Sequence, residues 1–169
     1  MGSAPAWRAS QMEAAYEVFT TLEEPTGAEE DWRYVDFQLP FSSLSPVPEP
    51  GPALPPGPFI DSLGSTSGLV RIVDGHVVEA HSEDVVVARF EDVGEQPSVV
   101  PVDHNKLAAA HTSFAHDGVF VDVPAGNVIS APLVIDIQGV TTDAATFPHV
   151  SVRVGESAEA RVLVVYRSA

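Results

Sequence analysis

A dense run of prolines divides the chain into two parts with different residue patterns. Eight of the 19 residues from position 40 to position 58 are proline. Proline fixes φ and lacks an amide hydrogen, so this run can be neither a helix nor an interior β-strand. We expect a stiff, polyproline-like spacer here; an SH3-type ligand is the alternative, but no basic residue flanks the run. The parts before and after it are therefore considered separately.

The residues before the prolines predict one amphipathic helix. The i, i+3, i+4, i+7 spacing of a single helical face is followed by Met12, Ala15, Tyr16 and Phe19. The run SQME fits a capping box, so we expect the helix to begin at Ser10, with Ser3 as a competing start. Pro25 and Gly27 should end it. One amphipathic helix cannot bury its apolar stripe alone, so it must dock on the rest of the chain or on a partner.

After residue 58 the pattern changes from helical to β. The dipeptide Asp74-Gly75 separates two β-rich runs, and it supplies the positive φ that a type I′ hairpin turn requires at both central positions. A short helix is expected at 104–114, and further strands at 85–90, 99–102, 119–123, 132–138, 147–154 and 161–166. Their spacing of about 12 to 15 residues suits either a β-sandwich or the rungs of a β-solenoid.

The last of these strands has no visible cap. A solenoid whose final strand is uncovered exposes its core and its edge hydrogen-bonding groups. We therefore expect either a partner over this end or a chain that continues, with truncation favoured. The 169-residue chain should be marginally stable or should self-associate through the strand near 162–166.

Composition argues against several classes of protein. The chain has 8 Lys and Arg against 24 Asp and Glu, a formal net charge of −16, so nucleic acid and anionic membrane surfaces are poor partners. It has no cysteine, which excludes disulfides, a thiol nucleophile and metal or cluster sites held by its own thiolates. No stretch approaches the roughly 18 apolar residues of a transmembrane helix, and the first residues do not fit a signal peptide. We expect a soluble, cytoplasmic protein.

Histidines are the main candidates for metal chemistry. His104 and His111 can share a helix face, with His116 and Asp117 just beyond, which makes a metal-dependent enzyme one hypothesis. Their spacing matches neither HExxH nor a two-histidine, one-carboxylate motif, so polar surface histidines are the simpler interpretation. A nucleophile elbow, a phosphate loop and a dinucleotide fingerprint are also absent from the sequence. We therefore predict that the chain is not an enzyme and assign no catalytic, cofactor-binding or metal residue.

Two stretches of the sequence together resemble one family. The first is Trp7-Arg8 followed, after the helix, by EDWRYVD at residues 30–36. The second and more specific is SFAHDGVFVDVPAG at residues 113–126, within the run 106–126, with FPH at 147–149 and the run 164–167 later. They resemble the SufB/SufD family of iron–sulfur cluster assembly proteins, with the first stretch closer to SufD. Val35 stands where the family pattern often has threonine. The resemblance covers nearly the whole chain but only the amino-terminal part of the family.

This resemblance implies a mixed α+β fold that is mainly β. A helical arm (1–39) and a proline-rich linker (40–58) precede a small α/β region with a hairpin and a short helix (59–116). The first rungs of a right-handed parallel β-helix follow (117–169), truncated here.

The implied function is that of a SufD-like, non-catalytic scaffold subunit of the SUF complex. It would pair with a SufB-like subunit and, through carboxy-terminal helices missing from this sequence, with a SufC-like ATPase. This segment itself would bind no cofactor, because the iron–sulfur cluster is handled by the whole complex. The alternative is a stand-alone β-rich binding module for a carbohydrate or protein ligand.

Overall fold

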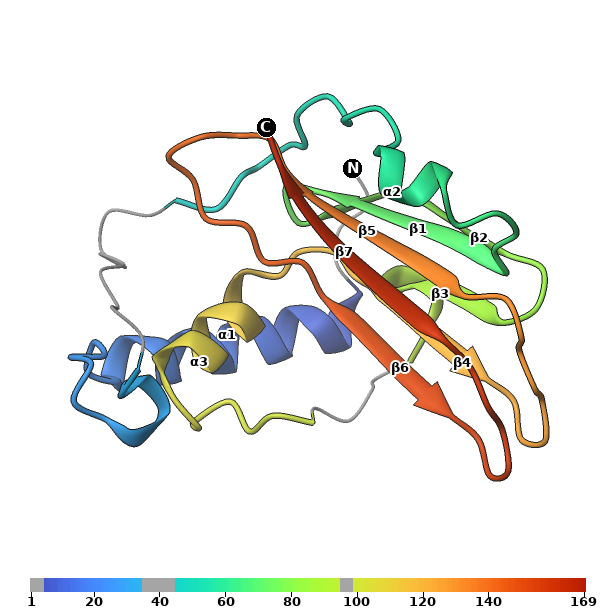
Figure 1. Cartoon of the computed structure of the whole chain (residues 1–169). Helices are drawn as coiled ribbons and strands as arrows, with labels where there is room; N and C mark the ends of the chain where they lie inside the picture. Colours follow the sequence, from blue (N-terminus) through green and yellow to red (C-terminus); the bar gives the residue numbers. More distant parts are fainter. Residues whose placement is uncertain (1–4, 35–44, 95–98) are drawn as a thin grey trace.

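The computed structural model describes residues 5–34, 45–94 and 99–169, and it shows a mixed α/β fold with seven strands (Figure 1). The helices are α1 (Ala6–Thr21), α2 (Pro58–Asp61) and α3 (Lys106–Phe114), with 3-10 turns η1 (Glu30–Trp32) and η3 (Phe90–Asp92). The strands are β1 (Gly68–Val73), β2 (His76–Ser82), β3 (Val86–Arg89), β4 (Val119–Val123), β5 (Leu133–Gly139), β6 (Val150–Val154) and β7 (Val162–Ser168).

The strands form two sheets that do not close on each other. One sheet has the order β2-β1-β5-β7 and the other β3-β4-β6. Successive strands from β4 to β7 alternate between the sheets, and β4–β6 and β5–β7 pair in parallel. In Figure 1 the two sheets lie at an angle to each other, with β6 and β7 on the same side of the molecule. The mixed α/β fold is confirmed, whereas the expected first rungs of a right-handed parallel β-helix are not shown by these two open sheets.

The predicted hairpin is confirmed in detail. Val73 pairs with His76 across a two-residue turn, in which Asp74 has φ of 50° and Gly75 has φ of 86°. A Cβ on Gly75 would also lie 3.1 Å from the amide nitrogen of Phe147. A side chain at this position would therefore crowd the backbone of Phe147 in addition to straining the positive φ.

The core lies between the facing sides of the two sheets. Alternate residues of each strand point inward, as the period of two requires. The inward residues of the first cluster are Val70, Ile72, Val77, Val119, Ile135 and Ile137, all of them buried. Burying a side chain of this size contributes about 1.5–3 kcal/mol, so this layer holds the two sheets together.

Helices α1 and α3 pack side by side next to the sheets (Figure 1). Ala15 is buried at their contact, and the Phe19 and Phe114 rings meet edge to face at 5.4 Å. The start predicted at Ser10 is wrong, because α1 already begins at Ala6. Pro5 precedes that first turn, where its fixed φ suits helix entry and its missing amide hydrogen costs nothing. The competing start at Ser3 lies outside the described residues.

The described part of the proline-rich run, residues 45–57, is bonded to the first sheet and is called the proline strap below. The Leu54 amide donates to Gln138 Oε1 at 2.7 Å, and the Arg167 guanidinium donates to the Pro55 carbonyl at 2.7 Å. Near the start of the strap, Val47 is buried and its carbonyl lies 2.9 Å from His76 Nε2. The sequence predicted a stiff spacer here, and the structure adds hydrogen bonds between its described residues and side chains of the first sheet.

Strand pairing joins the predicted small α/β region (59–116) to the predicted start of the β-helix (117–169). β1 pairs with β5, and β3 pairs with β4, so both sheets contain strands from 59–116 and from 117–169. The strand expected at 99–102 does not form. Val99 is 94% exposed there, and Pro101 has no amide hydrogen to offer a ladder.

Candidate interaction surface

The apolar residues that line the core on β4 and β5 are followed by apolar residues at the paired positions of β6 and β7, and several of these are exposed. Buried Val121 of β4 pairs with Val152 of β6, and buried Ile135 of β5 pairs with Val164 of β7. Val152 is 43% exposed and Val164 is 44% exposed, although both face inward like their buried partners. We call the inward residues of β6 and β7 the open layer: Val150, Val152, Val154, Val162, Val164 and Tyr166. Apolar side chains in this position gain free energy when another surface covers them.

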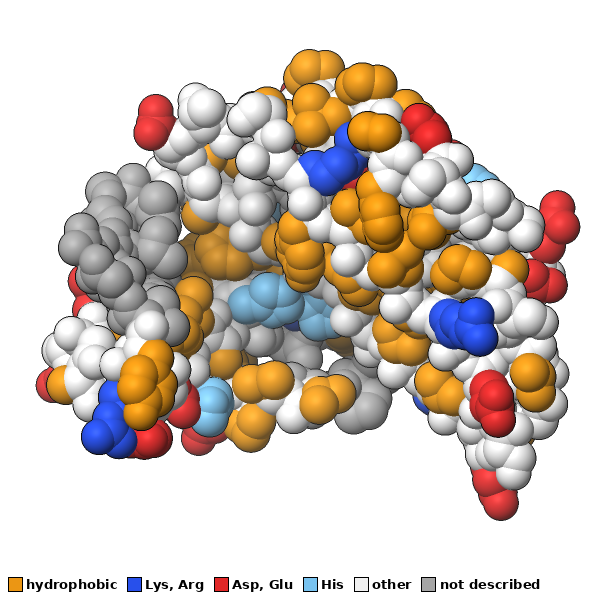
Figure 2. Space-filling model, in the orientation of Figure 1, with side chains coloured by type: hydrophobic (Ala, Val, Ile, Leu, Met, Phe, Trp, Pro, Cys, Tyr) orange, Lys and Arg blue, Asp and Glu red, His pale blue; other side chains and the backbone are white. Residues whose placement is uncertain are grey.

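The open layer borders a groove of about 750 Å³ between the sheets and the two packed helices. Trp7 and Gln11 of α1 and Leu107 of α3 line one side, and residues of β5, β6 and β7 line the other. Figure 2 shows the molecule hollowed at this place, with orange apolar side chains around the opening and pale-blue histidines inside it. The groove is a concave, largely apolar surface that can receive another molecule.

The floor of this groove is polar and cationic. Arg8 is 2% exposed, and its guanidinium donates to the carbonyls of Thr112 at 3.0 Å and Ala115 at 2.7 Å, at the end of α3. The His111 and His149 rings stack with centroids 5.0 Å apart. Burial, helped by the charge of Arg8, lowers the pKa of both histidines, and that of His149 falls from 6.5 to about 4. Both rings are therefore neutral at pH 7.

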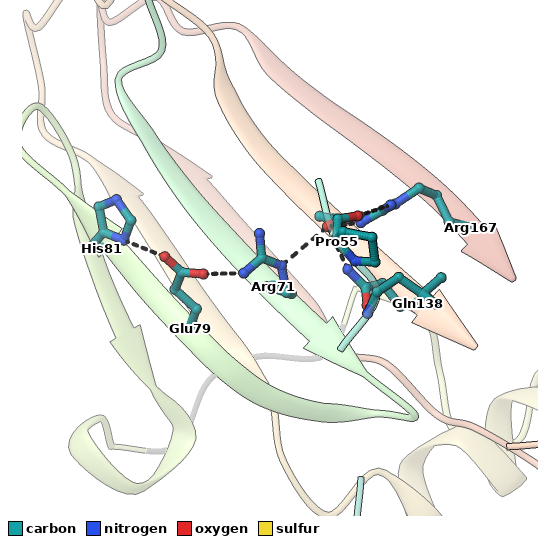
Figure 3. A network of polar contacts seen from close by, with 8 residues as sticks. Pro55, Arg71, Glu79, His81, Gln138 and Arg167 are labelled. Carbon is teal, nitrogen blue, oxygen red and sulfur yellow. Dashed lines mark hydrogen bonds and ion pairs between the residues drawn. The ribbon is translucent and has the colours of Figure 1, made fainter. Parts of the chain in front are cut away.

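A ladder of alternating charge crosses the outer face of the first sheet (Figure 3). Glu79 of β2, Arg71 of β1, Asp136 of β5 and Arg167 of β7 follow one another across the four strands. Asp136 is fully buried and is held by both arginines, with Arg167 donating from Nε at 2.8 Å and from Nη2 at 2.6 Å. These donors outweigh the effect of burial and lower the Asp136 pKa. The carboxylate is thus fixed in its charged form beneath the proline strap.

The second sheet carries a similar pair. Arg153 of β6 donates to both carboxylate oxygens of Asp122 of β4, each at 2.7 Å. The residues of this pair are 31 positions apart, as are Asp136 and Arg167. In each sheet, the inner strand therefore carries an aspartate and the edge strand an arginine. Bidentate pairs of this kind fix the register of neighbouring strands as well as contributing energy.

The histidines singled out from the sequence are dispersed. His104 lies 3.2 Å from Asp31, His111 Nε2 lies 3.1 Å from the Pro148 carbonyl, and Asp117 accepts the amide hydrogen of Val77. His116 is an exposed residue near His76, and partial desolvation of its ring, with a further contribution from Arg8, lowers its pKa. Across the parts of the chain that the structure describes, no three histidine or acidic side chains are placed to share a metal ion.

Sequence reasoning missed Arg8 and the charge ladder. Arg8 was noted only as part of the Trp7-Arg8 motif, and nothing local showed that it caps a helix 107 residues away. The aspartate and arginine pairs did leave a signal, because each pair has the same separation along the chain.

No protein-family model matches the chain, and no curated protein matches it in sequence. Among the described helices, none has the length and apolar character needed to cross a membrane.

Proposed function

We propose that this chain is a SufD-like, non-catalytic scaffold segment of the cytoplasmic SUF complex, which assembles iron–sulfur clusters. In this proposal β4 to β7 are the first two rungs of a right-handed parallel β-helix. The observation that supports it is the alternation of successive strands between two sheets, with each edge strand stacked in parallel and in register on the strand before it. Repeats of this kind build solenoids, in which each repeat rests on its neighbour.

The open layer and the groove favour a protein that works by association. A scaffold needs an extended surface that remains uncovered in the isolated chain, and β6 and β7 offer one along their whole length. The family's partners would be a SufB-like subunit and a SufC-like ATPase. In the family the ATPase docks on carboxy-terminal helices that have no counterpart among these residues, so we expect this chain to lack that contact.

Co-expression tests the proposal. The full 169-residue chain, tagged, should co-purify with a SufB-like subunit, and it should not retain a SufC-like ATPase expressed alone. A Val164→Lys variant should lose the SufB-like subunit, whereas Val78→Lys, at a similarly exposed position of β2, should keep it. Tight binding of the ATPase by the chain alone would contradict the domain assignment. Loss of all SUF association would contradict the function.

A stand-alone binding module for a carbohydrate or protein ligand is the second candidate. The groove favours it, because 750 Å³ is within the usual size of ligand pockets and its walls combine apolar and polar groups. A glycan array with several reproducible hits, reduced by a Trp7→Ala change in the groove wall, would favour this function over the scaffold.

A further inference from the structure

The second half of the proline strap has the character of a polyproline II segment. Residues 51–57 belong to no helix or strand, and Gly57 has φ of −84° and ψ of 151°, close to the polyproline II values. The prolines at 52, 55 and 56 fix φ near the same value. Because a polyproline II helix has three residues per turn, such a segment has three faces.

The burial of the strap follows this three-residue period. Gly51, Leu54 and Gly57 are half-buried, and the residues between them are all exposed. One face of the segment is therefore turned to the sheet and two faces are turned to solvent. We call the exposed residues of these two faces the proline ridge: Pro52, Ala53, Pro55 and Pro56. Phe59 of α2, which is 55% exposed, extends the apolar surface beyond the ridge.

Hydrogen bonds hold the half-buried face in place. The amides of Gly51 and Leu54 donate to side chains of the turn after β1 and of β5, at 3.0 and 2.7 Å. Further along, Arg167 donates to the Pro55 carbonyl (Figure 3). A Cβ on Gly57 would lie 3.3 Å from Nη1 of the same arginine. The ridge is thus ordered before anything binds it, so a partner that recognises this conformation loses little conformational entropy on binding.

The strap lies on the outer face of the first sheet, on the side away from the core. Asp136 and Gln138, which lie beneath the strap, alternate along β5 with the inward Ile135 and Ile137. The ridge is therefore separate from the open layer and from the groove, and its contacts with the sheet do not involve the outer edges of β6 and β7.

The charges around the ridge are acidic at both ends. Glu49 precedes it and Asp61 follows it, and both are exposed. The sequence has no lysine or arginine from residue 45 to residue 70, and Arg167 beneath the strap is paired with Asp136. An apolar ridge with carboxylates at its ends attracts a partner whose apolar slot is flanked by basic residues.

From these observations we infer that the proline ridge binds a partner protein with an aromatic-lined slot that recognises polyproline II segments and is flanked by basic residues. Aromatic rings pack between the prolines of such a ridge, as in known modes of proline-rich recognition. An SH3-type partner is less suited, because no basic residue flanks the prolines. A second copy of the chain is also a poor occupant, since its net charge of −16 repels the acidic ends. This goes beyond the proposed function, in which the SufB-like subunit meets β6 and β7.

A WW domain chosen for basic residues around its aromatic slot is the probe for this inference. It should bind the full 169-residue chain in a calorimetric titration and shift the amide NMR signals of Ala53 and Phe59. A free peptide of residues 48–61 should bind about tenfold more weakly, because it must be ordered on binding whereas the strap is already held by the sheet.

Matched variants locate the contact. Pro55→Ala keeps the carbonyl that accepts from Arg167 but removes an outward ring, and it should weaken binding at least fivefold. Pro52→Ala repeats the test on the same face. Pro48→Ala is the control, because this exposed proline lies before the segment that shows the three-residue period. Urea midpoints equal to that of the unchanged chain establish that each variant is folded.

Charge variants test the acidic ends. Glu49→Lys should weaken binding, and raising the salt concentration should reduce the difference from the unchanged chain. Asp103→Lys makes the same change of charge at an exposed position outside the strap and should leave binding unchanged.

Several results would overturn the inference. These are no binding of the WW domain, a free peptide that binds as tightly as the chain, equal losses for Pro55→Ala and Pro48→Ala, and signal shifts confined to other residues. Self-association of the chain that Pro55→Ala abolishes would assign the ridge to a second copy and would also overturn it. Val164→Lys should leave WW binding unchanged. Because the SUF proposal is judged by co-purification through β7, either result can fail without the other.

Discussion

The guanidinium of Arg8 lies 2.7 Å from the carbonyl oxygen of Ala115, 107 residues further along the chain. This bond attaches the first turn of α1 to the end of α3, where unpaired carbonyls and the helix dipole favour a cation. The two helices therefore dock through a buried charge in addition to their aromatic contacts.

Replacing Arg8 should release α1 from the body. Arg8→Met keeps much of the apolar stem but leaves the Thr112 and Ala115 carbonyls without their donor, so we expect a loss of about 2–3 kcal/mol in the free energy of unfolding. Urea denaturation followed by the combined fluorescence of Trp7 and Trp32 measures it. Arg33→Met is the control, because its pair with Glu30 is largely exposed and should leave the midpoint unchanged. Equal midpoints for the two variants would contradict this account.

Asp74 should be essential for fixing the proline strap. Its carboxylate accepts from the amides of Gly51, Val140 and Thr141 and from the Thr141 hydroxyl, at 2.8 to 3.2 Å. Asp74→Asn preserves the turn preference, since Asn-Gly also suits a type I′ turn. We expect it to cost about 2 kcal/mol and to speed hydrogen exchange at Gly51. Asp103→Asn, at an exposed position, should change neither quantity.

The two aspartate–arginine pairs should differ sharply in their effect on stability. Asp136 is fully buried, so Asp136→Asn leaves Arg71 and Arg167 without their carboxylate and should cost about 3 kcal/mol or more. Asp122 pairs with Arg153, whose side chain is 65% exposed, so Asp122→Asn should barely move the unfolding midpoint. Urea titrations of the two variants at pH 7 provide the comparison. The reverse order of effects would show that the ladder under the strap does not stabilise the sheet.

Stability should fall as the pH drops from 6.5 to 4. Above pH 6.5 His149 is neutral in the folded and the unfolded chain. Below it the unfolded chain takes up a proton, while the folded chain does not until its pKa of about 4. The difference reaches about 3 kcal/mol by pH 4. Unfolding midpoints across this range should flatten in His149→Phe, whereas His81→Gln, at an exposed site, should keep the wild-type slope.

The isolated chain should self-associate weakly through β7. The inward residues Val162, Val164 and Tyr166 are exposed on β7, whose outer edge pairs with no other described strand, and such edges pair with other edges. Sedimentation velocity should show average mass rising with concentration, and Val164→Lys should suppress the rise. A monomer at every concentration would argue that this edge is already protected.

Local patterns predicted most of the secondary structure. Asp74 and Gly75 predicted their turn because few residues accept positive φ. The alternation of residues in 119–123 predicted β4 because side chains of a strand alternate with a period of two residues. The start of α1 was misplaced because Ser10 has a good capping sequence, whereas the true start is stabilised by tertiary contacts of Trp7 and Arg8. The hydrogen bonds of the strap were not predicted, because its partners, such as Gln138, lie far along the chain.

The candidate surface was only partly predictable. The uncovered strand near 162–166 was predicted from its apolar run, which has no visible cap in the sequence. The groove did not, because it requires knowing that α1 and α3 stand beside the sheets without filling the space between them. The stacking of His111 on His149 joins residues that no motif connects.

The proline strap has a consequence for how the chain is made. The Pro55 carbonyl accepts a hydrogen bond from Arg167, 112 positions later, and the Leu54 amide donates to Gln138, 84 positions later, so an early segment is fixed by residues synthesised well after it. Domains rich in such distant contacts fold slowly. During synthesis the strap cannot form these hydrogen bonds until β5 and β7 have emerged from the ribosome. Until then its prolines keep the segment extended and away from premature pairing, so docking of the strap is expected to be a late and slow step of folding.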